Sequence, residues 1–134
     1  MKDRFKYRAW DKENKKYIYD VEKGLQFYST AGNLRVLTLA EVAESSKYDL
    51  EQCTGLTDKN NKLIYEGDIV KYHVIKKSSF PIEREVLAFK TKKVTFKKGY
   101  FSPVFNLDLN DVEIIGNIHE DSELLENNNV KHSE

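Results

Sequence analysis

The three histidines and the single cysteine are the residues of this chain best suited to acid–base, metal-binding or nucleophilic chemistry. His73, His119 and His132 have no other His, Cys, Asp or Glu at a metal-ligand spacing such as H-E-x-x-H, so the sequence predicts no metal site. Adjacent strand side chains point to opposite faces, so we interpret His119 as a half-exposed strand-end residue that does not act with Glu120. We place His73 on the solvent-facing side of its strand. We interpret Cys53 as a buried structural thiol, since an activated thiolate needs a nearby base or cation.

Motifs of other catalytic classes are mostly missing from the chain. Glu66 and Asp68 flank Gly67 and imitate a carboxylate pair, but acidic residues at a turn usually cap backbone N–H groups. The six glycines never form G-x-G, and there is no phosphate-binding G-x-x-x-x-G-K-[ST] motif. We therefore expect no catalytic residue, no cofactor and no enzyme activity. A deep pocket in which a histidine meets carboxylates would revive the enzyme hypothesis.

Charge is distributed unevenly along the chain, although 22 Lys and Arg balance 22 Asp and Glu. Zero net charge excludes a protein that is drawn to nucleic acid by its total charge. Residues 1–69 carry 12 charges of each sign, residues 70–98 carry nine basic and two acidic residues, and residues 99–134 carry one basic and eight acidic residues. The sequence leaves open whether the basic block is an exposed face or is neutralised by the acidic segment.

The basic block gives one candidate binding site, for nucleic acid. Its lysines are Lys90, Lys92, Lys93, Lys97 and Lys98, and the aromatic residues in and beside the block are Phe80, Phe89, Phe96, Tyr100 and Phe101. Lysines bind phosphates and aromatic rings stack on bases, so the combination suits nucleic acid. In the alternative interpretation, the lysines line a solvent face or protect an edge strand while the aromatic side chains face the core.

The first half of the chain predicts short strands, with one helix. Polar and apolar residues alternate over 5–10, which predicts a strand with one buried face, and a polar turn at 11–16 links it to a second strand at 17–21. Thr38 and Glu41 form a capping-box pattern that predicts a helix of at most two turns. A strand over 34–39 that runs into a polar loop is the alternative.

The second half predicts further strands and ends in a polar tail. A turn at 58–61 separates two strands, and in the next strand Val70, Tyr72 and Val74 face a core. Further strands are expected at 83–89, 92–96, 100–105 and 112–118, with residues 76–81 breaking the pattern. We expect a helical turn after Asp121 and a disordered tail from Asn127.

The composition indicates a domain without membrane spans, in a reducing compartment. One cysteine excludes an internal disulfide, which fits the cytoplasm. The longest uncharged stretch, residues 24–34, is far shorter than a membrane helix. We see no secretory signal at the start of the sequence, so we expect a cytoplasmic protein with no membrane partner.

Four motifs give the chain a resemblance to a known family. FKYRAWDK at 5–12 resembles the (I/F)KFRAWD signature of the YopX family of phage and prophage proteins. QCTGLTDKN at 52–60, LIYEGDIV at 63–70 and VEIIGNIHE at 112–120 resemble its QYTGLKDKNG, IYEGDIV and EVIGNIYE. Cys53 and His119 stand where the family usually has Tyr, and Asn61 stands where Gly is common. These departures weaken any family-wide role for Cys53 or His119.

The resemblance implies an all-β fold with one or two short helical turns, whose C-terminal half is similar to an SH3-type barrel. We expect a β-rich lobe at 1–62, an SH3-like lobe at 63–120, and a helical turn with a polar tail at 121–134. Within the motifs, Gly67 suits the positive φ of a tight turn that Asp68 caps. We also hypothesise a stacked, hydrogen-bonded corner of Arg8, Trp10 and Asp11.

The sequence and the resemblance together predict a non-enzymatic phage or prophage accessory protein in the cytoplasm of a bacterial host. With 12% aromatic residues and no catalytic constellation, a small binding module for a protein partner is the first choice. We expect its surface at Trp10, Tyr17 and Tyr19, together with the turn at 58–61. Nucleic-acid binding is the alternative, and self-association stays open.

Overall fold

The computed structural model describes residues 5–79, 81–97 and 99–125, and this part of the chain is mainly β, as the sequence predicts. The chain divides into two compact units, Met1–Gly55 and Leu56–Glu134. The turn after residue 57 groups with the second unit, because Asp58 Oδ2 accepts the backbone N–H of Ile114 at 3.0 Å. The expected boundary at residue 62 lies beyond this turn. Two expectations stay predictions. One is that the units are separate domains, and the other is that the second unit resembles an SH3-type barrel.

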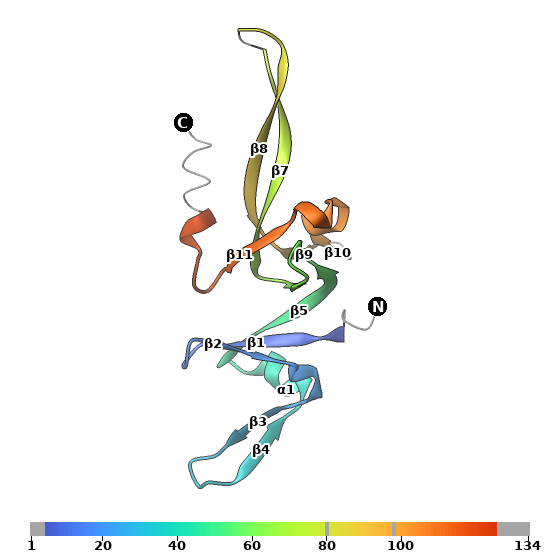
Figure 1. Ribbon diagram of the computed structural model, residues 1–134. Coiled ribbons are helices and arrows are strands. Elements are labelled where there is room, and N and C mark those ends of the chain that lie inside the picture. The colour runs from blue at the N-terminus through green and yellow to red at the C-terminus, as the bar shows by residue number, and fades with distance from the viewer. Residues whose placement is uncertain (1–4, 80, 98, 126–134) are drawn as a thin grey trace. The chain divides into compact units, whose positions relative to one another are not determined.

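The first unit contains an antiparallel sheet and a separate hairpin (Figure 1). In the sheet, β1 (Tyr7–Asp11) lies between β2 (Lys16–Tyr19) and β5 (Tyr48–Thr57). The hairpin consists of β3 (Leu25–Tyr28) and β4 (Leu34–Leu37), and it comes after a 3-10 turn, η2 (Val21–Lys23). The core of this unit is formed by Ala9, Val21, Leu25 and Val42.

The predicted helix is confirmed as α1 (Leu39–Glu44). The Thr38 hydroxyl accepts the Glu41 N–H at 3.2 Å, and the Glu41 carboxylate accepts the Thr38 N–H at 2.9 Å. These hydrogen bonds to Thr38 lower the pKa of Glu41, because they favour its charged form. The reciprocal cap places Val42 in the core of the first unit, so a local sequence signal fixes this element.

The prediction that β1 buries only one face is wrong. Arg8, Ala9, Trp10 and Asp11 are all buried. Ala9 belongs to the core, whereas Arg8 on the other face donates from Nε to Glu51 Oε1 at 2.8 Å. A charged residue therefore occupies a buried position here because it is paired across the sheet.

The second unit holds a three-stranded sheet in the order β11-β7-β8 and a smaller hairpin. The three strands are β7 (Asp68–Ser78), β8 (Arg84–Lys93) and β11 (Glu113–Asn117); the hairpin pairs β9 (Thr95–Lys97) with β10 (Tyr100–Ser102). β6 (Leu63–Tyr65) follows β5 after the turn. Two 3-10 turns, η3 (Val104–Asn106) and η4 (Leu109–Asp111), precede β11.

The core of the second unit confirms the alternation predicted for β7. Its buried members are Ile64, Val70, Tyr72, Val94, Phe101, Val104 and Val112. Val74 packs against this core as well, whereas His73 is exposed. One face of β7 therefore meets the core, and the other face points away from it.

The turn before β7 is built as its sequence predicts. Gly67 adopts a φ of 91°, a conformation that residues with a side chain rarely adopt. Asp68 Oδ2 accepts the Tyr65 N–H at 2.8 Å, and the Gly67 N–H donates to the Val94 carbonyl at 2.9 Å. This turn aligns the start of β7 with the end of β8.

Several strand boundaries differ from the prediction. β7 continues to Ser78 rather than breaking at 76, and residues 84–93 form one strand where two were expected. The long antiparallel register supplies partners that local propensity does not reveal. β10 ends at Ser102, where a 3-10 turn takes over. Residues 123–125 are helical, and the expected polar tail from residue 127 lies outside the described residues.

Candidate functional site

The strands β7 and β8 form a long, twisted hairpin that continues past β11 (Figure 1). β11 pairs with β7 only between Asp68 and Lys71, whereas β8 pairs with it from Ile69 to Ser78. We call residues 72–78 of β7 and their β8 partners the arm. Because successive residues alternate between faces, the register alone assigns each arm side chain to one of two faces.

The first face of the arm, which we call the outer face, exposes large apolar side chains. It carries the cross-strand pairs His73–Phe89 and Ile75–Leu87. Ile75 is 66% exposed, Leu87 is 68% exposed and Phe89 is 53% exposed. Tyr72 and Val74 point to the opposite side, where they meet the core, so the outer face has no core beneath it. A contiguous exposed apolar patch of this kind is typical of a contact surface.

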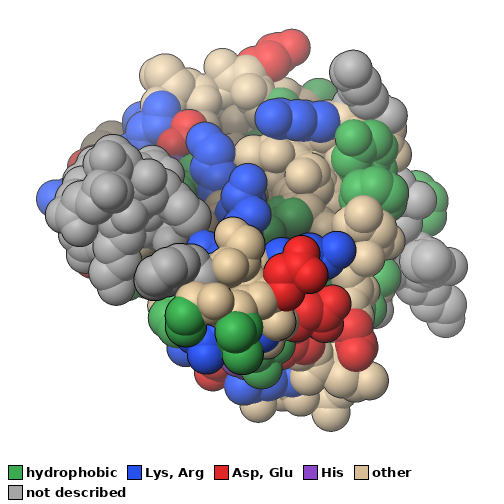
Figure 2. All heavy atoms as spheres, turned by 90° about the horizontal axis from the view of Figure 1, so that it is seen from above, with side chains coloured by type: hydrophobic (Ala, Val, Ile, Leu, Met, Phe, Trp, Pro, Cys, Tyr) green, Lys and Arg blue, Asp and Glu red, His purple; other side chains and the backbone are tan. Residues whose placement is uncertain are grey.

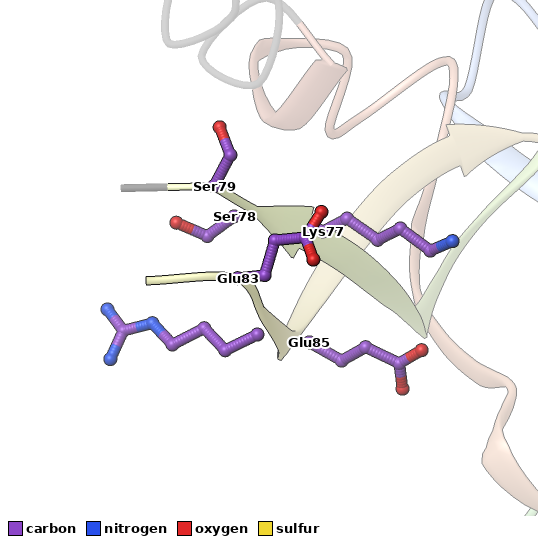
Figure 3. A pocket seen from close by; sticks show the side chains of 6 residues that line it. Lys77, Ser78, Ser79, Glu83 and Glu85 are labelled. Atoms are coloured by element: carbon purple, nitrogen blue, oxygen red, sulfur yellow. The ribbon is translucent and has the colours of Figure 1, made fainter. Parts of the chain in front are cut away.

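Charged side chains border the outer face at both ends. Lys71 Nζ lies 4.4 Å from the centre of the Phe89 ring, a cation–π contact. At the other end Lys77 pairs with Glu85, and both side chains extend in the same direction (Figure 3). The apolar patch is therefore bounded by charges, as the core of a binding surface is bounded by a polar rim.

The second face of the arm and its base, which we call the basic face, meets the core through Val70, Tyr72 and Val74, and it also carries cations. Its cross-strand rows place Lys92 opposite Val70, Lys90 opposite Tyr72, Lys76 opposite Val86 and Arg84 opposite Ser78. No strand residue of these rows is acidic. Within residues 5–79, 81–97 and 99–125, no ion pair joins these four cations to a carboxylate. In the view of Figure 2, Lys and Arg side chains lie at the surface with Asp and Glu side chains beside some of them.

The structure divides the lysines that the sequence groups together. Lys90 and Lys92 lie on the basic face, while Lys93 belongs to the row of Ile69 on the other face. Lys97 lies in β9 and is exposed, and Lys98 is outside the described residues. The folded chain thus keeps two of the five on one surface and adds Lys76 and Arg84, which the sequence analysis missed. Only the register of the hairpin reveals that combination.

Several aromatic side chains of this region are exposed rather than buried. Phe89, Phe96 and Tyr100 are all exposed, whereas Phe101 joins the core and packs on Phe96 with ring centres 4.8 Å apart. Phe80 lies outside the described residues. The alternative in which the aromatic side chains face the core is therefore wrong for three of the four described rings.

The predicted protein-binding residues Trp10, Tyr17 and Tyr19 lie together, but mostly as a packed cluster. Trp10 is only 6% exposed and meets the Tyr17 ring edge to face, with centres 5.0 Å apart. The Arg8 guanidinium lies 3.9 Å over the Tyr17 ring, and the Tyr17 hydroxyl donates to Glu51 at 3.0 Å. Tyr19 is exposed. The cluster orders the sheet of the first unit and leaves one of the three predicted rings open to a partner.

The hypothesised corner of Arg8, Trp10 and Asp11 is partly replaced by these contacts. Arg8 stacks on Tyr17, while Asp11 Oδ1 accepts the backbone N–H groups of Glu13 and Asn14, each at 3.0 Å. Asp11 therefore caps the turn between β1 and β2. The predicted polar turn is confirmed, but its first residue does not belong to the aromatic stack.

His73 meets a carboxylate, and the pair is open to solvent. Its Nδ1 lies 2.6 Å from Asp111 Oδ1, and its backbone N–H donates to Asp111 Oδ2 at 2.7 Å. These hydrogen bonds, from the imidazole and then from the backbone, hold the pKa of Asp111 below its ordinary value. The His73 side chain is 47% exposed and that of Asp111 is 35% exposed. The pair links η4 to β7 at the base of the arm.

A polar hollow lies at the tip of the arm (Figure 3). It is lined by Lys77, Ser78, Ser79, Glu83, Arg84 and Glu85. Mixed charges and hydroxyls line it, so it continues the polar rim of the outer face.

The hairpin of the first unit also exposes apolar side chains. Leu34, Val36 and Tyr28 are exposed on one face of β3 and β4, where Leu34 pairs with Tyr28. The β3–β4 hairpin has four cross-strand residue pairs, so it is much shorter than the arm. It offers matched positions against which substitutions in the arm can be compared.

Two further properties concern the described part of the chain. No group of three or more His, Cys, Asp or Glu side chains there is placed to hold a metal ion. No helix there has the length and apolar character needed to cross a membrane.

Comparisons with known proteins agree with the family resemblance that the four sequence motifs indicate. The model of the YopX protein family matches residues 6–126. The chain is similar to the crystal structure of protein EF1440 from Enterococcus faecalis, with 26% sequence identity and a TM-score of 0.52, over 90% of this chain and 96% of that one. No curated protein matches the chain. The family match spans nearly the whole sequence and contains all four motifs almost completely, so the chain belongs to the YopX family.

Proposed function

We propose that this YopX-family chain is a non-enzymatic phage or prophage accessory protein that binds a protein partner in the bacterial cytoplasm. The observation that carries the proposal is the outer face of the arm, where Ile75, Leu87 and Phe89 are exposed on a hairpin that has no core on that side. Exposed apolar side chains surrounded by a charged rim favour a protein surface as the ligand. A reducing location fits the single, buried Cys53.

The outer face suits a partner with an apolar patch of its own. Burial of a single Leu or Ile side chain contributes about 1.5–3 kcal/mol, so two such residues and a Phe can supply the central contacts of an interface. The neighbouring Lys71 and Lys77 favour acidic groups at the edge of the partner surface. Affinity then depends mainly on the apolar side chains, and the lysines contribute to association rate.

The proposal is tested by quantitative affinity capture from lysogenic bacterial cells. The wild-type chain is compared with Ile75→Ser/Leu87→Ser, and with Leu34→Ser/Val36→Ser as a matched control on the other exposed hairpin. We expect the arm variant to lose at least tenfold of a reproducibly captured protein, which mass spectrometry identifies, and the control to retain it. Equal capture by all three chains, or loss only with the control variant, argues against the outer face.

A further inference from the structure

The strand β8 is the edge strand of its sheet, and it is long for that position. It pairs with β7 through all 10 of its residues, in the sheet order β11-β7-β8. In the part of the chain that the structure describes, no strand pairs with the other edge of β8. Alternate residues of an antiparallel ladder direct their N–H and C=O groups away from the partner strand, so this edge presents backbone donors and acceptors to a further strand.

The middle of β8 lacks the features that normally keep an edge strand from pairing. Such features are prolines, bulges and charged side chains. β8 contains no proline, and its register with β7 runs from end to end without a shift. Residues 86–89 (VLAF) are uncharged, and Leu87 and Phe89 are exposed. An open, apolar edge of this kind is a template for pairing with another chain.

The charges of β8 make the strand complementary to a reversed copy of itself. Glu85 lies near its start, whereas its lysines lie near its end. We consider two antiparallel copies of β8 related by a twofold axis at Phe89. The facing pairs are then Glu85–Lys93, Val86–Lys92, Leu87–Thr91, Ala88–Lys90 and Phe89–Phe89. An acidic residue therefore faces a basic residue at both ends of the ladder, and no like charges face each other.

Neighbouring registers lack this complementarity. An axis at Ala88 places Arg84 opposite Lys92, and an axis at Lys90 places that lysine opposite its own copy. Like charges that face each other destabilise a strand pair. The sequence of β8 thus favours one register, which is the register that centres on Phe89.

We propose that two copies of this chain dimerise through the edges of their β8 strands, antiparallel about a twofold axis at Phe89. The two three-stranded sheets then form one sheet of six strands, and each copy contributes the same surface, as a twofold interface requires. The ladder covers residues 85–93 of both copies, or about 30 Å at 3.3 Å per residue. Pairing at the edge leaves both outer faces exposed on the same side of the sheet, so the dimer does not depend on the proposed protein partner.

Sedimentation velocity of the full chain tests the dimer, which should have twice the 15.7 kDa mass of one chain. Glu85→Lys should weaken dimerisation at least about tenfold, because the twofold axis replaces two attractive pairs by two repulsive ones. Adding Lys93→Glu should restore the dimer. Lys93 is not the cross-strand neighbour of Glu85 within one chain, where Glu85 faces Lys77, so only pairing between copies explains the rescue. Glu44→Lys, at an exposed position of α1, is the matched control and should dimerise like the wild type.

Crosslinking of engineered cysteines tests the register. Phe89→Cys places two thiols at facing positions on the axis, so a short bismaleimide should join the two copies. Val86→Cys is the control, because its two thiols would lie about 20 Å apart along the ladder and should not be joined. The native Cys53 is buried, and the wild-type chain measures any reaction at that thiol.

Three results overturn the proposal. One is the mass of a single chain at every concentration up to about 100 μM, which excludes a dimer of useful affinity. Another is a failure of Lys93→Glu to rescue Glu85→Lys while circular dichroism shows a folded chain. The third is equal crosslinking at positions 86 and 89. A single-chain mass combined with intact capture of a partner protein refutes the dimer alone and leaves the proposed function standing.

Discussion

At the scale of single residues, buried carboxylates order the turns of this chain by accepting backbone N–H groups. Asp58 accepts from Asn60 at 2.8 Å, from Lys62 at 3.0 Å and from Ile114 at 3.0 Å. Asp58 is buried, so water cannot replace a lost acceptor. This explains in physical terms why the turn motif at 52–60 carries an aspartate, and the motif needs no catalytic interpretation.

Replacing Asp58 by alanine should lower the free energy of unfolding by roughly 2–4 kcal/mol, because three backbone donors lose a charged acceptor. Urea denaturation measures this change. Asp108→Ala is the matched control, since Asp108 is exposed and its Oδ1 accepts the Asn110 N–H at 3.0 Å. Its loss should cost about 1 kcal/mol or less. Equal effects of the two variants count against the role given to Asp58.

The His73–Asp111 pair predicts a pH dependence of stability. Because the pKa of Asp111 is lowered in the folded chain, its contribution is present above the unfolded pKa and is lost as the pH falls through the folded value. Asp111→Asn should therefore be less stable than the wild type at pH 6, and this difference should shrink between about pH 5 and pH 2. Thermal unfolding across that range measures it, and a difference that does not change with pH would refute the assignment.

At the scale of elements, β11 contains an irregularity that depends on one glycine. The register of β11 with β7 shifts between Ile114 and Gly116. A Cβ added at Gly116 would lie 2.5 Å from Asp121 Oδ2 and 2.7 Å from Asp121 Cβ. Asp121 Oδ2 also accepts the Asn117 N–H at 3.1 Å, so the glycine lets the following turn close on the strand.

Gly116→Ala should destabilise the chain by about 1–3 kcal/mol, since the clash includes Asp121 Cβ and not only the flexible end of that side chain. A double-mutant cycle with Asp121→Gly tests the cause. On the Asp121→Gly background, which lacks the clashing atoms, adding Gly116→Ala should cost much less. If the cost is the same on both backgrounds, contact with Asp121 is not its origin.

Elements encoded by neighbouring residues could be predicted from the sequence, and those encoded by distant pairing could not. The capping box at Thr38 and the turn at Gly67 depend on residues three or four positions apart, and both were predicted. The burial of both faces of β1 depends on the pairing of Arg8 with Glu51, which are 43 positions apart in the sequence. The two faces of the arm depend on the register of β7 with β8, so Ile75 and Leu87 became candidate residues only in the folded chain.

At the scale of the whole molecule, zero net charge conceals a local division of charge. The basic block forms most of the arm, and in the acidic segment Asp111 contacts His73 on the arm, whereas Glu113 contacts Lys59. The arm thus has an apolar face and a cationic face that belong to the same hairpin. Our account assigns the exposed apolar face to a protein partner.

Site-specific photo-crosslinking in lysogenic cells tests the central claim, partner binding by the outer face, most directly. A photoreactive benzoylphenylalanine is placed at position 87 on the outer face or at position 86 on the basic face, which are adjacent in sequence but point to opposite sides. We predict that position 87 crosslinks to the protein identified by affinity capture and that position 86 does not. Crosslinking to that protein from position 86 alone, or equally from both positions, would contradict the account.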